Sequence, residues 1–277
     1  MEAELPPGAP LTAEALQPGL DTAWLARELH WLERTDSTMR VAGELAARGA
    51  AHGAAVIAEE QSAGRGRLGR SFHSPPRANL YASILLRPIP RGMLAPTLVL
   101  AAGVAVAECV AGWLDAPARV DVKWPNDVRI DRKKTSGILV ELASDALLPL
   151  WAVLGIGVNL NVDPATFPDE FRSRATSLAA ASGRPVDRIA FTQRLFGTLE
   201  RVLDLHASEG FAGVRPRFEV WFRMAGQEVR VLEPAGRTLE GVVAGVDPDG
   251  ALRLVGRDGR ELRVLAGEVT LLPETRG

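Results

Sequence analysis

Up to about residue 162, this chain contains short runs in which apolar residues are consecutive or alternate with polar ones. Both patterns are typical of β-strands when turn residues bound them. Pro88 stops one run, and Pro125 divides another into a strand, a turn and a second strand. We therefore expect strands of a mixed or antiparallel sheet within 54–61, 79–88, 118–131, 135–144 and 147–162.

Three other segments have helical character. Residues 36–38 supply capping side chains for a helix that ends near Gly49, and 187–209 is the longest amphipathic segment. The segment 94–114 is apolar almost throughout, with Glu108 as its only charge. Its length would suffice to cross a membrane, but it is rich in Ala and Gly and has no basic flank. We expect it to be a helix buried in the core.

The two ends of the chain differ from this pattern. Residues 1–21 are rich in Pro, Ala and Glu and lack the features of a signal peptide, so they predict a loose leader. Residues 22–34 predict a short amphipathic turn or helix that runs into a strand. From about Gly226, β-branched runs alternate with turn signals, two of which are Asp-Gly pairs. This predicts a small SH3-like β-barrel over 224–277, after a larger domain over 22–223.

Composition narrows the function classes. The chain has 277 residues and a formal net charge of -2, which argues against a dedicated nucleic-acid-binding protein because those usually carry a basic excess. Cys109 is the only cysteine, so an internal disulfide is excluded and a reducing cytosol fits. With only four scattered histidines, a structural zinc site is not expected.

The loop at 62–78 carries the most distinctive chemistry. Its segment 64–71 has glycines in a G-x-G-x-x-G pattern and approximates a phosphate-binding loop. Both of those motifs must open a helix, whereas here two prolines follow within 72–76. Three arginines within 65–70 repel one another unless an anion binds. We interpret the loop as a lid over a phosphate; a solvated, flexible surface loop is the alternative.

Two further segments could contribute to a site. Lysines occur at 123 and 133–134, around a Pro-containing turn, and could be rigidly held charges or only exposed lysines of a hairpin. Gly155 and Gly157 end an apolar strand without the third glycine of a dinucleotide fingerprint. They indicate either a strand kept bare for a ligand or a β-bulge.

Taken together, these segments are similar in order and spacing to those of the biotin protein ligase family. The resemblance covers roughly residues 22–273. It rests on Asp36-Ser37-Thr38, Gln61, Gly64-Arg65-Gly66-Arg67-Leu68-Gly69-Arg70, Lys123-Trp124-Pro125-Asn126-Asp127, Lys134-Thr135-Ser136-Gly137-Ile138-Leu139-Val140-Glu141 and Gly155-Ile156-Gly157-Val158-Asn159. It implies an α/β (α+β) fold, with a mixed sheet flanked by helices as in class II synthetases and lipoate ligases, followed by the SH3-like barrel.

The resemblance also implies roles for individual residues. Lys134 would bridge the biotin carboxylate and the α-phosphate of ATP, Arg67 and Arg70 would meet phosphate, and Asn159 would lie near the adenylate. Asp127 is a candidate to orient or deprotonate the acceptor lysine, with turn capping as the alternative. The biotin- and nucleotide-binding set would be completed by Ser37, Thr38, Met39, Gln61, Gly64, Arg65, Gly66, Gly137, Gly155 and Gly157.

The implied reaction joins biotin, through biotinyl-AMP, to a lysine of the biotin carboxyl carrier protein of acetyl-CoA carboxylase, with ATP and Mg²⁺. We expect a cytoplasmic monomer or homodimer without nucleic-acid or membrane partners, and no metal-ligating protein residues. The chain departs from the family at Met39, where asparagine is common, and at 72–73, where tryptophan is often seen. The alternatives are a lipoate or octanoate ligase, which the arginine loop disfavours, and a catalytically silent biotin-binding protein.

Overall fold

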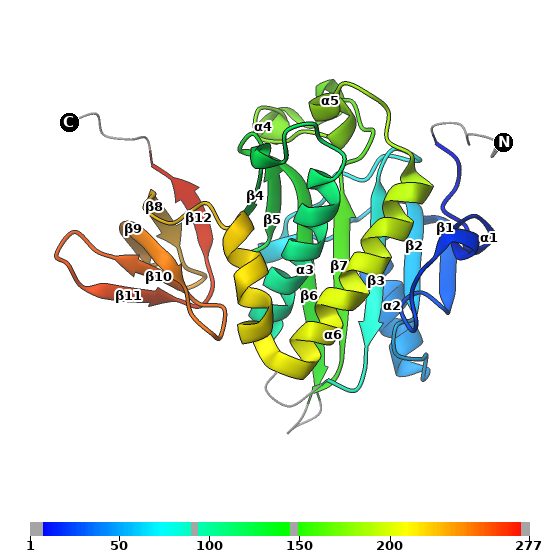
Figure 1. Ribbon diagram of the computed structural model, residues 1–277, viewed down its shortest axis with the longest axis horizontal. Coiled ribbons are helices and arrows are strands. Elements are labelled where there is room, and N and C mark those ends of the chain that lie inside the picture. Colours follow the sequence, from blue (N-terminus) through cyan, green and yellow to red (C-terminus); the bar gives the residue numbers. More distant parts are fainter. Residues whose placement is uncertain (1–7, 90–93, 145–148, 273–277) are drawn as a thin grey trace.

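The computed structural model of the protein describes residues 8–89, 94–144 and 149–272. It has a seven-stranded sheet of order β1-β2-β3-β7-β6-β5-β4 and a five-stranded sheet of order β11-β10-β9-β8-β12 (Figure 1). β1 and β2 are parallel and every other pair in the large sheet is antiparallel, so the predicted mixed sheet is confirmed. Within the described ranges, no helix is both long enough and apolar enough to span a membrane.

The large sheet uses all of the predicted strand segments. Its strands are β1 (Leu29–Thr35), β2 (Ala55–Gln61), β3 (Leu80–Leu86), β4 (Val120–Lys123), β5 (Asp127–Ile130), β6 (Lys133–Ser144) and β7 (Pro149–Val158). The start of the predicted segment 147–162 lies outside the described residues.

Helices cover both faces of this sheet. α3 (Ala95–Ala111) and α6 (Arg188–Trp221) pack together on the face toward the viewer in Figure 1, and α2 (Thr38–Ala47) covers part of the opposite face. α3 is the predicted apolar helix, and most of its side chains are buried, as expected for a helix between the sheet and α6. Two short helices, α4 (Asp169–Arg172) and α5 (Leu178–Ser182), lie in the connection from β7 to α6.

Strand alternation assigns each residue to one of these faces. On β7, Leu154 and Ile156 belong to the main core together with α3, whereas Val153 packs with Met39 of α2. Gly155 and Gly157 share the parity of Val153 and therefore open onto the α2 face. This face carries the site described below.

α6 is longer than the predicted helix 187–209. Gly210 has φ 66 and ψ -165, which breaks the helical geometry at the predicted end. A second helical segment continues to Trp221, with Pro216 inside it and with Phe211 and Phe218 buried. The predicted C-terminal end at residue 209 therefore coincides with the kink at Gly210. The helix resumes beyond it because Phe211 and Phe218 pack into the core.

The predicted loose leader is wrong for residues 8–21. They form α1 (Ala13–Leu16) and the 3₁₀ turn Gln17–Gly19, and the Leu11 and Leu16 side chains are fully buried. For 22–34 the sequence predicted a turn or helix that runs into a strand, and the turn alternative is confirmed, because 23–28 form turns and bends before β1. Glu200 of α6 fixes these turns by accepting hydrogen bonds from the backbone N–H groups of residues 23–25.

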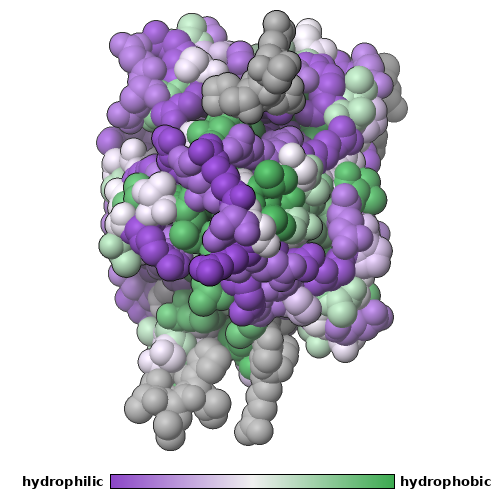
Figure 2. Space-filling model, turned by 90° about the vertical axis from the view of Figure 1, so that its left-hand side faces the viewer, coloured by the Kyte–Doolittle hydropathy of each residue, from purple (hydrophilic) through white to green (hydrophobic). Residues whose placement is uncertain are grey.

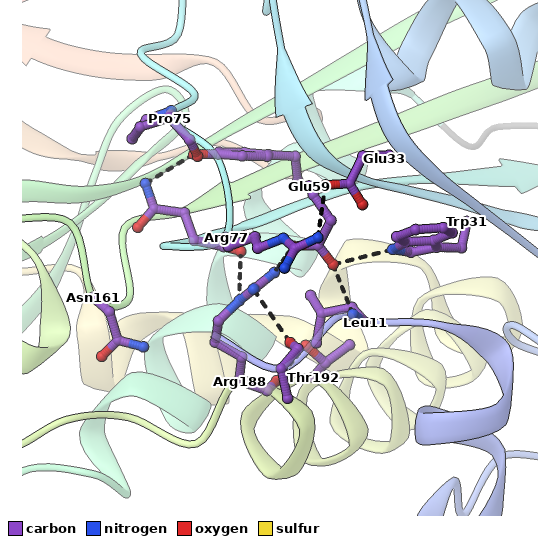
Figure 3. Close-up of polar contacts among 12 residues, drawn as sticks. Leu11, Trp31, Glu33, Glu59, Pro75, Arg77, Asn161, Arg188 and Thr192 are labelled. Atoms are coloured by element: carbon purple, nitrogen blue, oxygen red, sulfur yellow. Dashed lines mark hydrogen bonds and ion pairs between the residues drawn. The ribbon is translucent and has the colours of Figure 1, made fainter. Parts of the chain in front are cut away.

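A buried ion pair holds this N-terminal segment on the core (Figure 3). Arg188 Nη2 lies 2.6 Å from Glu59 Oε2, and both side chains are at most 1% exposed. The other carboxylate oxygen of Glu59 accepts from the Leu11 N–H at 2.7 Å and from Trp31 Nε1 at 3.1 Å. Burying two charges is tolerable only when each is paired and hydrogen-bonded in this way. The network connects the residues just before α1 with β1, β2 and α6.

The C-terminal domain is the predicted small β-domain, at the left of Figure 1. Its strands are β8 (Glu228–Leu232), β9 (Thr238–Val246), β10 (Leu252–Val255), β11 (Glu261–Val264) and β12 (Glu268–Leu271). Gly236, Gly250 and Gly259 have φ between 77° and 87°, as the predicted hairpin turns require. Figure 2 faces this end of the molecule and shows hydrophobic patches separated by bands of hydrophilic side chains.

The two domains share one hydrophobic core. Trp124, in the turn between β4 and β5, is 1% exposed and donates its indole N–H to the Gly250 carbonyl oxygen at 2.9 Å. Its backbone N–H points to the sulfur of Met224, which is fully buried. The core cluster runs from α3 and the large sheet into Val229 and Val231 of β8. The C-terminal domain therefore packs against the β4–β5 hairpin.

Candidate active site

The site is built on a patch of the sheet that lacks side chains. Gly157 of β7 pairs directly with Gly137 of β6, and Gly155, two residues away on the same face, pairs with Leu139. Because neighbouring strands lie about 4.8 Å apart, these glycines form a continuous hollow on the α2 face.

Protein side chains occupy part of this hollow. A Cβ on Gly155 would come within 2.7 Å of the Met39 sulfur, and a Cβ on Gly157 would come within 2.7 Å of the Phe72 ring. A Cβ on Gly137 would meet Lys134 Nζ at 3.0 Å. The glycines therefore make room for the Met39, Phe72 and Lys134 side chains as well as for a ligand.

Polar groups gather where α2 begins. Gln61 Oε1 accepts from the backbone N–H of Thr38 at 2.9 Å and from its hydroxyl at 3.1 Å, and Ser83 donates to the Thr38 hydroxyl at 2.8 Å. Ser37 is 2% exposed, and its hydroxyl has no hydrogen-bond partner among the described residues. A buried hydroxyl left unpaired costs free energy, so this end of the cavity suits a ligand with a polar group.

The arginine loop closes over the cavity as a compact turn. Gly66 N–H donates to the Arg70 carbonyl oxygen at 2.7 Å around the 3₁₀ turn Arg67–Gly69. A Cβ on Gly64 would clash with the Phe72 carbonyl oxygen at 2.7 Å, so this glycine is needed for the loop itself. Arg65 pairs with Glu141 of β6 at 3.1 Å.

The other two arginines of the loop meet the C-terminal domain. Arg67 Nη1 donates to the Gly267 carbonyl oxygen at 3.2 Å, and Arg70 pairs with Glu268 at the start of β12. Burial lowers the pKa of Arg67, and the hydrogen bond from Arg70 lowers the pKa of Glu268. Sequence reasoning missed Gly267 and Glu268, because nothing in the pattern of β12 distinguishes them from a barrel edge.

Lys134 and Asp127 form the pair at the centre of the site. Lys134 Nζ lies 2.7 Å from Asp127 Oδ1 and 6.0 Å from the centre of the Phe72 ring. Asp127 opens β5 directly across from Gly137 of β6, which places the pair at the edge of the glycine hollow. Lys123, the last residue of β4, pairs in register with Asp127 and also lines the cavity.

Most of the residues predicted for the site meet at this one cavity. It is lined by Ser37, Thr38, Met39, Gln61, Arg65, Gly66, Arg67, Arg70, Asp127, Lys134, Gly137, Gly155 and Gly157. Two predicted residues do not line it. Gly64 lies behind Phe72, and Asn159 is turned away, with its amide nitrogen donating to the Thr176 carbonyl oxygen at 3.1 Å.

The donor set of the cavity suits anions rather than a protein-bound metal. Among the residues that the structure describes, no group of three or more His, Cys, Asp or Glu side chains could hold a metal ion. The cavity is lined by two carboxylates that are already paired, Asp127 and Glu268, and by five cationic side chains, Arg65, Arg67, Arg70, Lys123 and Lys134. This excess of positive charge beside a polar-ended hollow can bind a phosphate and a carboxylate together.

Two family models match the chain. Residues 31–159 match the biotin/lipoate A/B protein ligase family, and 225–272 match the biotin protein ligase C-terminal domain. The two matches correspond to the large sheet with its site and to the five-stranded sheet.

Similar proteins and structures agree with these models. The chain is 36% identical over 263 residues to a biotin–[acetyl-CoA-carboxylase] ligase of Mycobacterium tuberculosis, covering 92% of each. It is 34% identical over 249 residues to the bifunctional ligase/repressor BirA of Bacillus subtilis, covering 90% of this chain and 76% of the relative. The biotin protein ligase of Aquifex aeolicus, solved in complex with biotin and ATP, superposes with a TM-score of 0.76 at 30% identity, covering 89% of this chain and 99% of that structure.

Proposed function

Because this chain belongs to the biotin protein ligase family and joins biotin to protein at the expense of ATP, we propose that its glycine-lined cavity makes biotinyl-AMP and transfers the biotin to a lysine of a biotin carboxyl carrier protein. The observation that carries the assignment of the site is the meeting of cationic side chains from three distant segments over that hollow. These are the arginine loop, the β4–β5 hairpin and the start of β6.

In the first step, the biotin carboxylate oxygen attacks the α-phosphorus of ATP, and pyrophosphate leaves. Both reacting groups are anionic, so their repulsion must be offset where charge accumulates. Lys134 is suited to bridge the carboxylate and the α-phosphate, because Asp127 at 2.7 Å holds its ammonium group at the edge of the glycine hollow. Arg67 and Arg70 of the arginine loop line the same cavity and are suited to bind phosphate oxygens.

Biotin fits the polar end of the cavity better than lipoate or octanoate does. The ureido ring of biotin has donors and an acceptor that can pair with the Ser37 hydroxyl, which has no partner among the described residues, and with the Thr38–Gln61 pair. The dithiolane ring of lipoate and the alkyl chain of octanoate would leave the Ser37 hydroxyl buried and unpaired. Sites built to hydrogen-bond a substrate reject analogues that lack the group by several orders of magnitude.

Biotinyl-AMP is a mixed anhydride, so water must be kept from it until the acceptor arrives. The arginine loop is suited to this task because Arg67 and Arg70 anchor it to the C-terminal domain and Phe72 packs over Gly157. Such exclusion of water also strengthens the electrostatic interactions inside the cavity.

In the second step, the acceptor lysine attacks the biotinyl carbonyl carbon, and AMP leaves with the electrons of the C–O bond. The attacking ammonium group must first lose a proton. We assign its orientation and deprotonation to Asp127, which lines the cavity beside Lys134. A general base must lie within hydrogen-bond reach of the proton that it accepts.

Mg²⁺ enters as the partner of ATP. It prefers phosphate oxygens, water and one or two carboxylates, and Asp127 and Glu268 are the carboxylates that line this cavity. The residues present therefore fit an ion carried mainly by the nucleotide. Its chemical contribution would be to neutralise phosphate charge.

The proposed acceptor and setting extend beyond the site. We propose a cytoplasmic monomer or homodimer that binds neither nucleic acid nor membrane. The net charge of -2 and the buried thiol of Cys109 support this proposal. Specific retardation of an operator-like DNA at nanomolar protein and physiological salt would contradict the part concerning nucleic acid.

The test of the proposed function is transfer to a defined acceptor. The purified protein is incubated with ATP, Mg²⁺ and a biotin carboxyl carrier domain, with biotin as the acid or, in a parallel reaction, with lipoate. The mass of the acceptor is then measured by mass spectrometry. We expect one biotin per domain on a single lysine, and none when that lysine is replaced by arginine. An acceptor that stays unmodified, or that is modified with lipoate in place of biotin, would contradict the proposal.

A further inference from the structure

One cationic side chain in the cavity has no role in the mechanism above. Lys123 ends β4, lines the cavity and is partly buried. It makes no ion pair with any residue of the described ranges. Asp127, its partner in the strand register, pairs with Lys134 at 2.7 Å, and Glu268 pairs with Arg70. Lys123 therefore lines the cavity without an ion-pair partner among the described residues.

The surroundings of Lys123 make this an unfavourable position for a free cation. Burial lowers its pKa, and the neighbouring charges of Arg129 and Lys134 lower it further, against the opposing effect of Asp127 and Glu268. A partly desolvated ammonium group beside another ammonium group gains most from a ligand that brings negative charge. The same position would serve no purpose for a neutral ligand.

The arrangement of the cations indicates which anion Lys123 meets. Attack at the α-phosphorus and departure of the leaving group are roughly in line, so pyrophosphate leaves on the side away from the biotin carboxylate. Lys134 lies at the glycine hollow, where a Cβ on Gly137 would touch it. Lys123 lies two strands from that hollow, because Gly137 of β6 pairs with Asp127 of β5 and Asp127 pairs with Lys123 of β4. Lys123 is thus set back from the hollow that would hold the biotin carboxylate, on β4 at the edge of the large sheet.

We propose that Lys123 binds the β- and γ-phosphates of ATP and stabilises them as the departing pyrophosphate, an inference that rests on the proposed function. As the carboxylate oxygen forms its bond to the α-phosphorus, the bond from that phosphorus to the bridging oxygen breaks, and its electron pair leaves on pyrophosphate. Lys123 remains protonated and donates hydrogen bonds to the oxygens on which the charge grows. It has no part in the transfer step, because pyrophosphate has already left.

This separation of the two steps gives the experiment. Lys123→Met removes the charge with similar length, Lys123→Arg keeps a charge, and Lys133→Met is the matched control, since Lys133 is an exposed lysine next to Lys134 in the sequence. Three quantities are measured: the single-turnover rate of biotinyl-AMP formation, the KM for pyrophosphate when supplied biotinyl-AMP is converted back to ATP, and the rate of biotin transfer from supplied biotinyl-AMP to the acceptor.

We expect Lys123→Met to slow adenylate formation and raise the KM for pyrophosphate by about 10- to 100-fold, the scale of one charge-assisted hydrogen bond. The transfer rate should stay within about twofold of wild type. Lys123→Arg should recover most of the loss, and Lys133→Met should match wild type in all three measurements.

An unchanged KM for pyrophosphate would overturn the proposal, as would equal slowing of adenylation and transfer, because Lys123 would then act on the adenylate or on the fold. If Lys123→Met does not fold, judged by its melting temperature, Lys123→Gln is measured instead. Binding of inorganic pyrophosphate to wild type and variant by calorimetry tests Lys123 even if the wild type makes no biotinyl-AMP. A wild type that makes no biotinyl-AMP would refute the proposed function, whereas unchanged pyrophosphate binding in the variant would refute the role of Lys123.

Discussion

At the residue scale, the site works through charges that other residues hold in place. Asp127 fixes Lys134 at 2.7 Å, and Glu268 of the C-terminal domain holds Arg70. A cation that is oriented before the substrate arrives loses little reorganisation energy during the reaction. The effect of replacing such a residue should therefore appear mainly in the rate of the chemical step.

Replacing Lys134 tests this directly. Lys134→Ala should slow biotinyl-AMP formation by about 100-fold, or roughly 3 kcal/mol of transition-state stabilisation, which is the scale of one preorganised donor. The melting temperature should change little, because Lys134 is only partly buried. Single-turnover adenylation is the measurement, and near-normal rates in the variant would remove Lys134 from the mechanism.

Replacing Arg67 should separate synthesis of the adenylate from its retention. Arg67→Gly loses both the bond to the Gly267 carbonyl oxygen and the contact with phosphate, so the closed loop is weakened while Lys134 still supports the first step. We expect biotinyl-AMP to dissociate at least several-fold faster and to label lysines of bystander proteins. The measurements are the adenylate off-rate and biotin incorporation into albumin. If both match wild type, the loop does not retain the adenylate.

Sequence patterns located the residues of the site that belong to compact motifs, such as 37–38 and 65–67. They missed residues whose role depends on a distant partner. Glu268 matters because it meets Arg70 across 198 positions of the chain, and Phe72 matters because it lies over Gly157. Lys123 was part of a recognised motif, but only the folded hairpin shows that it lines the cavity.

At the scale of elements, the pairing of α3 and α6 contains a buried titratable group. His206 of α6 is 3% exposed, and its Nε2 lies 3.0 Å from the Thr97 hydroxyl of α3. That hydroxyl already donates to the Leu94 carbonyl oxygen, so it accepts from Nε2. Nδ1 then has no hydrogen-bond partner among the described residues, and protonating it would bury an unpaired charge.

A dependence of stability on pH follows. Burial lowers the pKa of His206 below its usual 6.5, so the unfolded chain binds a proton more readily than the folded protein. The stabilisation is complete above about pH 6.5 and is lost as the pH falls toward the folded pKa, by up to about 1.4 kcal/mol per pH unit. Urea unfolding of wild type and His206→Asn between pH 5 and 7 should show a smaller slope for the variant. Equal slopes would contradict this account.

The ion pair between β2 and α6 gives a second prediction. Glu59→Gln leaves the Arg188 guanidinium buried without its counter-charge, which should cost about 3–5 kcal/mol of unfolding free energy. The control is Glu33→Gln, which breaks an exposed pair with Arg77 and should cost at most about 1 kcal/mol. Urea titrations measure both. Equal losses would show that burial does not set the strength of the Glu59–Arg188 contact.

The same network explains which elements sequence patterns could predict. Strands and helices with clear periodicity were placed correctly, down to the barrel turns at Gly250 and Gly259. The segment 8–21 was not, because its order comes from Glu59 and Arg188, far along the chain, and not from a local pattern. Composition that is rich in Pro and Ala describes a loose segment and a packed one equally well.

At the scale of the whole molecule, the two domains behave as one body because they share a core. Trp124 is buried between them, and the hydrophobic cluster continues from α3 into β8. The C-terminal strands also contribute to the cavity through Gly267 and Glu268. The shared core argues against independent folding of the C-terminal domain.

Unfolding should therefore occur in a single transition. We expect tryptophan fluorescence and far-UV circular dichroism to give the same midpoint in urea, with calorimetric and van't Hoff enthalpies in agreement. Two separated transitions, with the smaller one assigned to 224–277, would show that the domains are only loosely attached.

The central claim is that the cavity activates biotin with ATP. Exchange of labelled pyrophosphate into ATP measures this step alone, without an acceptor, and it can be run with biotin, lipoate or octanoate as the acid. The account predicts exchange that requires biotin, is at background level with the other two acids, and is reduced about 100-fold in Lys134→Ala. Exchange driven equally well by lipoate, or equally fast in the variant, would contradict it.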